Sequence, residues 1–260
     1  RRIAGTQLNA LLDPFLMIDE INSDDANDYI GGFPEHPHRG METITFMKAG
    51  RMRHRDHLGN EGVIGPGDVQ WMTAGKGILH SEMPEQEGGL LHGFQLWLNL
   101  PANEKMKPAA YRDIRASEIP TSQLSPGGKV AVIAGEVKVN GLQTLKGVLP
   151  ELSTHPVMMD VRLNENEMLS LQFNSKFPAL VYVIKGELSG EEAITQNHMG
   201  VYSEGDALTL EAGSKGASML ILSGKPLNES IAQYGPFVMN TRAEIDQAIK
   251  DFRQGCFVSG

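Results

Sequence analysis

The chain is poor in several residue types, and each scarcity narrows what it can be. Its 260 residues hold a single cysteine, Cys256, which excludes an intrachain disulfide and fits a reducing compartment. No run of about 18 apolar residues is present, so we expect no membrane-spanning segment and a cytoplasmic protein. Lys and Arg number 23 against 32 Asp and Glu, and the net charge of −9 argues against direct nucleic-acid binding. The chain opens on Arg1 rather than Met, so we expect the natural protein to begin further upstream.

One short segment runs against the acidic balance of the chain. It contains Lys48, Arg51, Arg53 and Arg55. Because charged side chains on a strand usually face solvent, we interpret this run as a solvated strand face. The competing interpretation is a surface for a protein partner.

Glycine and proline are abundant, at 29 and 14 residues, and they separate short segments rich in branched and aromatic residues. This is the pattern of many strands joined by turns, and it predicts an all-β fold. Strands are expected over 41–47, 53–57, 69–73, 93–99, 130–139 and 157–163. The one clear helix covers about 241–254, because Thr241 and Glu244 form a capping box and Gly255 suits a C-terminal stop.

An internal repeat organises these segments. Gly67-Asp68 and Ala74-Gly75 recur as Gly205-Asp206 and Ala212-Gly213, each displaced by 138 residues. A repeat of this size indicates duplication of a domain rather than a solenoid, whose period is roughly 20–50 residues. The chain is therefore expected to hold two copies of an all-β unit.

Two pairs of metal-ligating residues stand out in the first copy. His36 and His38 form one X-x-X pair, and His80 and Glu82 form another. Alternate residues of a strand point to the same face, so each pair can reach one point in space. If the two strands are neighbours, three imidazoles and a carboxylate form a site for a divalent first-row transition metal. A closed structural zinc site is the alternative, but such sites usually use cysteine.

The second copy does not repeat these ligands. The positions displaced by 138 hold Asn174, Lys176, Ser218 and Leu220. None of these is an imidazole or a carboxylate, so only the first copy is expected to bind metal.

Three segments carry a resemblance to the pirin family, a branch of the bicupin proteins: GGFPEHPHRGMET (31–43), PGDVQWMTAGKGILHSEMP (66–84) and HGFQLWLNLP (92–101). The resemblance implies two tandem cupin β-barrels, a metal-binding barrel over 1–125 and a second barrel without ligands over 126–260, closed by the helix. It also implies one iron held in the first barrel by the residues at His36, His38, His80 and Glu82. Fe(II) is the expected metal, with Mn, Co, Ni, Cu and Zn as alternatives that accept the same donors.

The sequence departs from the general cupin pattern at one ligand. The common first motif carries a glutamate where Glu42 stands, whereas the His80-x-Glu82 pair is the pirin arrangement. We therefore expect Glu82 to be the ligand and Glu42 to be a supporting or structural carboxylate.

Several pirin-like proteins are similar to quercetin 2,3-dioxygenases, which open the central ring of a flavonol with O2 and release carbon monoxide. The resemblance implies that chemistry here, on a flavonol or related enolic compound, with Glu82 as the catalytic proton acceptor. Candidates for the pocket wall or for support of the ligands come from the same motifs: Phe33, Met72, His92, Phe94, Gln95 and Trp97. His54 and His57 are expected to lie outside the ligand set.

The resemblance also implies a function of a different class. Eukaryotic pirins act as transcriptional cofactors in which the oxidation state of the iron alters partner affinity, and some bacterial relatives bind metabolic enzymes. The chain would then be an iron-dependent redox-sensing regulatory protein that binds a protein partner without catalysis. A substrate-sized apolar cavity above the ligands would favour catalysis, and a closed pocket would favour sensing.

Overall fold

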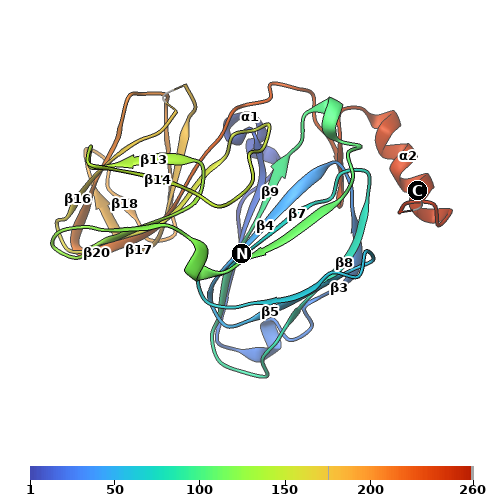
Figure 1. Ribbon diagram of the computed structural model, residues 1–260, viewed down its shortest axis with the longest axis horizontal. Coiled ribbons are helices and arrows are strands. Elements are labelled where there is room, and N and C mark those ends of the chain that lie inside the picture. The colour runs from blue at the N-terminus through green and yellow to red at the C-terminus, as the bar shows by residue number, and fades with distance from the viewer. Residues whose placement is uncertain (175, 259–260) are drawn as a thin grey trace. The chain divides into compact units, whose positions relative to one another are not determined.

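The computed structural model describes residues 1–174 and 176–258, which form two compact units (Figure 1). Unit 1 contains residues 1–116 and 227–260, and unit 2 contains residues 117–226. This division differs from the expected boundary at 125/126 in two ways. The first unit ends at residue 116, and the chain returns to it after residue 226. Within the described residues, no helix combines the length and the apolar character needed to cross a membrane.

Unit 1 is built from two β-sheets whose strands form opposite walls of a barrel, with β4, β7 and β9 on one wall and β3, β5 and β8 on the other (Figure 1). In sheet order the first contains β1 (Arg2–Ala4), β2 (Phe15–Ser23), β9 (Leu91–Asn99), β4 (Met41–Ala49), β7 (Val69–Thr73) and β10 (Ala110–Ile114). The second contains β3 (Phe33–His38), β8 (Ile78–Pro84), β5 (Met52–Asp56) and β6 (Glu61–Ile64). A short helix, α1 (Asn9–Leu12), precedes β2.

Unit 2 consists of one ten-stranded sheet that also curls into a barrel-like form. Its strands are β11 (Thr121–Gln123), β12 (Lys129–Ala134), β13 (Glu136–Val139), β14 (Gln143–Lys146), β15 (Val157–Leu163), β16 (Met168–Gln172), β17 (Ala179–Ser189), β18 (Ile194–Thr195), β19 (Met199–Tyr202) and β20 (Leu208–Ser223). The predicted strand over 130–139 is two strands, because Gly135 adopts φ +79° and turns the chain between β12 and β13.

The structure preserves the repeat seen in the sequence. β4 begins at Met41 and β17 at Ala179, and β6 spans 61–64 while β19 spans 199–202, each pair displaced by 138. The copies diverge afterwards: unit 1 has separate strands β7 and β8, whereas unit 2 continues through the matching region as the single strand β20. Both units are therefore β-barrels, as the prediction of two tandem barrels requires.

The C-terminal segment belongs to unit 1, not to the second barrel as expected. β21 (Ala232–Tyr234), β22 (Phe237–Met239) and α2 (Arg242–Arg253) form a small cluster in which Phe237, Ile245 and Phe257 pack with Leu79 of β8. The buried Arg39 guanidinium pairs with Asp251 of α2 at 2.7 Å. The capping box is confirmed, with Thr241 accepting from the Glu244 N–H and the Glu244 carboxylate accepting from the Thr241 N–H.

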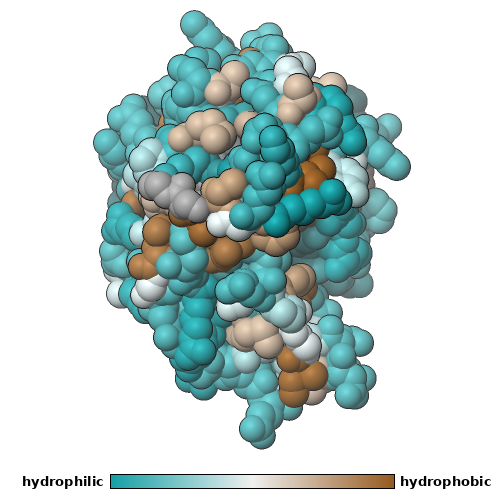
Figure 2. Space-filling view, turned by 90° about the vertical axis from the view of Figure 1, so that its right-hand side faces the viewer, coloured by the Kyte–Doolittle hydropathy of each residue, from teal (hydrophilic) through white to brown (hydrophobic). Residues whose placement is uncertain are grey.

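The surface is mainly hydrophilic on the face that Figure 2 shows, which is the side of α2 in Figure 1. Apolar side chains appear there in small groups rather than as one broad patch. Such scattered groups are ordinary on a soluble domain. Two residues of the basic run are paired with acids nearby, since Arg53 pairs with Glu61 and Glu85 and Arg55 pairs with Glu61. This pairing favours the solvated-face interpretation over a partner surface.

Candidate metal centre

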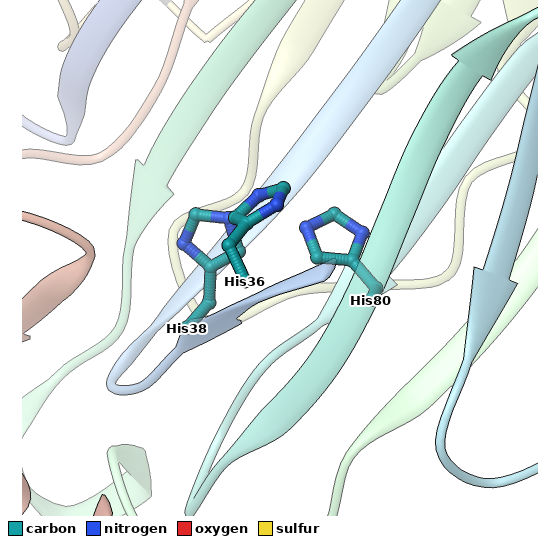
Figure 3. Close-up of side chains that lie close together, drawn as sticks. All are labelled: His36, His38 and His80. Carbon is teal, nitrogen blue, oxygen red and sulfur yellow. The ribbon is translucent and has the colours of Figure 1, made fainter. Parts of the chain in front are cut away.

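Strand pairing brings the two ligand pairs together, as the strand-parity argument requires. β3 and β8 run antiparallel, and His36 lies directly opposite His80 in their register. The three imidazoles of His36, His38 and His80 point toward one another from these neighbouring strands (Figure 3). One ligand nitrogen from each ring lies within 4.8 Å of the others. This spacing suits three nitrogen donors around a single ion.

Each of the three rings has a contact with a residue outside the cluster. His36 Nδ1 lies 2.8 Å from the Pro34 carbonyl oxygen, and His80 Nδ1 lies 3.4 Å from His54 Nδ1. The backbone carbonyl of Pro236 accepts from His38. Such contacts orient imidazole ligands and select the nitrogen that remains free.

Two buried nitrogens of the cluster have no hydrogen-bond partner among the described residues. They are Nδ1 of His38 and Nε2 of His80. Burial lowers the pKa of His38 to about 3, and burial and the neighbouring imidazoles lower that of His80 as well. Neutral imidazoles with unpartnered lone pairs are the form that binds a metal ion, so these residues fit such an ion.

Glu82 lies beside this cluster but outside the 4.8 Å group. It faces Phe33 on one neighbouring strand and His54 on the other. Its Oε1 lies 3.1 Å from the Thr45 hydroxyl, and the Gln95 side chain also hydrogen-bonds to it. Burial raises the pKa of Glu82 to about 7, although both hydrogen bonds oppose that shift. Its role as a fourth ligand therefore stays a prediction.

A cavity of about 610 Å³ opens onto the cluster within unit 1. His36, His38 and Glu82 line it together with the ion pairs Arg1–Glu20 and Arg2–Asp19. Its apolar lining residues are Met17, Ile21, Phe33, Trp97 and Pro236. The Trp97 ring meets the His38 ring edge to face, with their centroids 5.2 Å apart. The volume is of the size that holds a drug-sized ligand.

Three of the predicted pocket residues line this cavity, namely Phe33, Gln95 and Trp97. Met72 and Phe94 do not line this cavity, because both are buried in the core, where Met72 packs with Ile78. Both were candidates because they belong to the family motifs, and membership of a motif does not distinguish core packing from cavity lining.

Glu42 and His92 have partners of their own. Glu42 is fully buried, accepts from the Thr73 hydroxyl at 2.6 Å and lies 3.4 Å from Lys107 Nζ. His92 Nε2 lies 3.0 Å from Glu20 Oε1. These contacts fit structural roles, as expected for Glu42.

The sequence did not reveal the role of His54. Its side chain is fully buried on β5 against His80, with ring centroids 5.2 Å apart. The signal available was the alternation of His54 and Asp56 on one face of a strand, which strand parity could have connected to the His80 pair.

Family profiles, relatives and a solved structure agree on one family for this chain and confirm the prediction of two cupin barrels. Sequence profiles described as Pirin and as Pirin C-terminal cupin domain match residues 1–98 and 158–258. A Pseudomonas aeruginosa protein named "Putative quercetin 2,3-dioxygenase" is 46% identical over 98% of this chain and 90% of its own length. Mouse pirin is 39% identical over 97% of this chain and 86% of its own. The crystal structure of a quercetin 2,3-dioxygenase from Acinetobacter baumannii superposes with a TM-score of 0.89 at 37% identity, covering 97% of this chain and 89% of that one.

Proposed function

Because the chain belongs to the pirin family, we propose that it is a metal-dependent dioxygenase that opens the ring of quercetin or a related flavonol with O2. The observation that carries the proposal is the substrate-sized, largely apolar cavity whose wall includes His36 and His38, two of the three converging imidazoles. A protein that only sensed the state of its iron would not need this volume above the ligands.

A redox-active divalent ion held by His36, His38, His80 and Glu82 would supply open coordination positions for a substrate oxygen and for O2. Fe(II) is the proposed ion, with Mn, Co, Ni and Cu able to accept the same donors. The ligand set contains three neutral donors and one carboxylate, so a divalent ion would keep a net charge of about +1 and favour an anionic substrate oxygen.

Glu82 is the proposed proton acceptor for the flavonol 3-hydroxyl. Its carboxylate lines the cavity and is held by Thr45 and Gln95. The Thr45 hydroxyl also lies 2.9 Å from Gln95 Oε1, and its single proton can serve only one acceptor at a time. Thr45 can therefore turn from Glu82 to Gln95 when the carboxylate gains the substrate proton.

The apolar side chains of the cavity have a separate task. Trp97 stands against His38, and Phe33 lies nearer the exposed edge of β3. Together they present flat, apolar surface to a planar aromatic substrate and keep water from the reacting atoms.

The test is anaerobic loading with Fe(II), followed by measurement of O2 consumption and carbon monoxide release with quercetin. The wild type should release one carbon monoxide per O2 consumed, and His38→Ala should lose this activity. His198→Ala in unit 2 is the matched control, because the side chain of that exposed histidine hydrogen-bonds with Thr195 and Gln196 of the same turn and should leave turnover unchanged. Stoichiometric iron binding without turnover would replace the proposal with the redox-sensing binding protein.

A further inference from the structure

In the imidazole cluster, His80 is the member whose Nδ1 atom contacts a fourth imidazole, that of His54. Its Nδ1 lies 3.4 Å from Nδ1 of His54, a contact buried between β8 and β5. On its other side, His54 Nε2 lies 3.3 Å from Asp56 Oδ2. The side chains of His54 and Asp56 are fully buried. A continuous line of contacts therefore runs from Asp56 through His54 to His80.

The Asp56 carboxylate is fixed by the turn that follows β5. Its Oδ1 accepts from the backbone N–H groups of Leu58 at 2.9 Å and Asn60 at 3.0 Å. Its Oδ2 accepts from Asn60 Nδ2 at 2.8 Å. A carboxylate surrounded by three N–H donors acts as an acceptor, so the group that faces it from His54 must be a donor.

The proton positions on His54 and His80 follow from the Asp56 carboxylate, which can only accept. If His54 Nε2 carries its proton toward Asp56, the neutral His54 ring has a lone pair on Nδ1. That lone pair accepts the proton on His80 Nδ1, and the remaining lone pair of His80 then lies on Nε2. This is the buried nitrogen that has no partner among the described residues. The reverse arrangement would aim a lone pair of His54 at the carboxylate and place a proton on the ligand nitrogen of His80.

We propose that Asp56 and His54 are positioning residues that fix the proton of His80 on Nδ1 and so reserve Nε2 for the metal ion. The inference rests on the metal centre of the proposed function but not on the reaction performed there. The line acts like the carboxylate that often stands behind a metal-bound histidine, here extended by one imidazole.

The surroundings hold His54 in the plane this line requires. The Tyr111 ring stacks on His54 with centroids 4.5 Å apart and an interplanar angle of 24°. The Tyr111 hydroxyl donates to Asp113 Oδ1 at 2.6 Å, which fixes the tyrosine in turn. Gly62 lies opposite His54 on β6, and a Cβ there would overlap the Tyr111 hydroxyl and the Asp113 carboxylate. The packing thus holds the plane of the His54 ring.

The first measurement needs no variant. Long-range 1H–15N correlation spectra of the metal-free, 15N-labelled protein distinguish the two tautomers of each neutral histidine. The proposal requires that His80 carries its proton on Nδ1 and His54 carries its proton on Nε2. A proton on Nε2 of His80 overturns it.

The decisive variant is Asp56→Asn. The two backbone N–H groups hold the side-chain oxygen, so the amide nitrogen takes the place of Oδ2 and offers a proton to His54 Nε2. The Asn60 side-chain amide, which donates to Oδ2 in the wild type, can turn its oxygen toward the new N–H group. The His54 and His80 tautomers should then both reverse. Competition titration with Co(II) should show an affinity lower by roughly 10–100-fold, as for loss of other groups behind a metal ligand.

His57→Asn is the matched control. His57 follows Asp56 in sequence but accepts from the Leu79 N–H and is not part of the line, and asparagine keeps an acceptor there. It should leave the His80 tautomer and the Co(II) affinity unchanged. His54→Phe keeps the stacking on Tyr111 but removes both hydrogen bonds, and it should leave His80 as a mixture of tautomers with weakened Co(II) binding.

An Asp56→Asn protein that binds Co(II) less well while His80 keeps its proton on Nδ1 would show only a structural role, and it would overturn the proposal. Unchanged affinity in both Asp56→Asn and His54→Phe would do the same. Failure of the proposed function would be a separate result. A wild type that binds Co(II) but never turns over quercetin would still allow the tautomers and the Co(II) affinities to be measured.

Discussion

The two barrels share a strand plan but enclose opposite kinds of side chain. Unit 1 buries Thr45 on β4, Gln70 on β7 and His80 on β8. At the positions displaced by 138, unit 2 has Val183, Leu208 and Ser218, and the two apolar residues join a large core of valine, leucine and methionine. Within the described residues, the one cluster able to hold a metal ion lies in unit 1.

The difference concerns the free energy needed to bury polar side chains inside a barrel. Burying an unpaired polar group costs free energy, so each polar side chain of unit 1 needs a partner. Most have one, as Thr45 has Glu82 and Gln95, whereas two imidazole nitrogens do not. Unit 2 buries fewer polar side chains, although the hydroxyls of Thr154 and Ser223 also lack a partner within the described residues. The comparison therefore predicts that unit 1 is the half whose stability and binding respond to single substitutions.

The largest effect is expected from breaking the attachment of α2 to unit 1. Asp251→Asn leaves the Arg39 guanidinium, whose side chain is 5% exposed, without its anion. Removing one partner of a buried pair costs about 3 kcal/mol. Hydrogen exchange should accelerate in β22 while β20 of unit 2 is unaffected. Equal acceleration in both units would contradict the assignment of the segment to unit 1.

The same pair gives a pH dependence of known sign. The hydrogen bond from Arg39 holds the pKa of Asp251 below its ordinary 3.8. A carboxyl group whose folded-state pKa is lowered stabilises the fold above its unfolded pKa, and this contribution is lost as the pH falls further. The stability of unit 1 should therefore drop below pH 3.8, and Asp251→Asn should flatten that part of the curve. A steeper drop in the variant would contradict the sign.

The second prediction separates the two buried glutamates of unit 1. Glu82→Gln removes the charge that lines the cavity beside the imidazoles, and the affinity for Co(II) should fall by roughly 100-fold. Glu42→Gln is the matched change, since Glu42 is equally buried but bonds to Thr73 and Lys107. Isothermal titration should find its affinity close to that of the wild type. If Glu42→Gln lost more affinity than Glu82→Gln, the general cupin ligand pattern would apply instead.

The third prediction exchanges one matched position between the barrels. Val183→Thr places a hydroxyl in the apolar core of unit 2 at nearly constant volume and should cost about 1–3 kcal/mol in urea unfolding. Thr45→Val makes the opposite change in unit 1 and removes a hydrogen bond that lowers the pKa of Glu82. The pKa of Glu82 should rise, so Co(II) binding should need a higher pH. If Val183→Thr left the free energy of unfolding unchanged, the interior of unit 2 would tolerate a polar group, and the two interiors would not differ in the cost of burying one.

The sequence predicted the parts of the site that depend on strand alternation alone. His36, His38 and His80 meet because residues two apart share a face and because β3 pairs with β8. Alternation could not show what lies across the barrel, so the contact of His54 with His80 was missed. The family motifs could not separate the buried Met72 and Phe94 from the residues that line the cavity. The repeat likewise fixed the register of β4 and β17 but contained no information on where residues after 226 would pack.

The smallest predicted effect tests that last point, the return of the chain to unit 1. Thr241 caps α2 by accepting from the Glu244 N–H, and Thr241→Ala should cost about 1 kcal/mol. Because Ile245 and Ala248 of α2 are buried with Phe237 and Phe257 in unit 1, the loss should appear as faster hydrogen exchange in α2 and β22. Thr241→Ser keeps the accepting oxygen and should restore the wild-type rates. If exchange in β20 of unit 2 accelerated instead, the helix would close the second barrel, and the apolar unit would no longer be the independent half of the comparison.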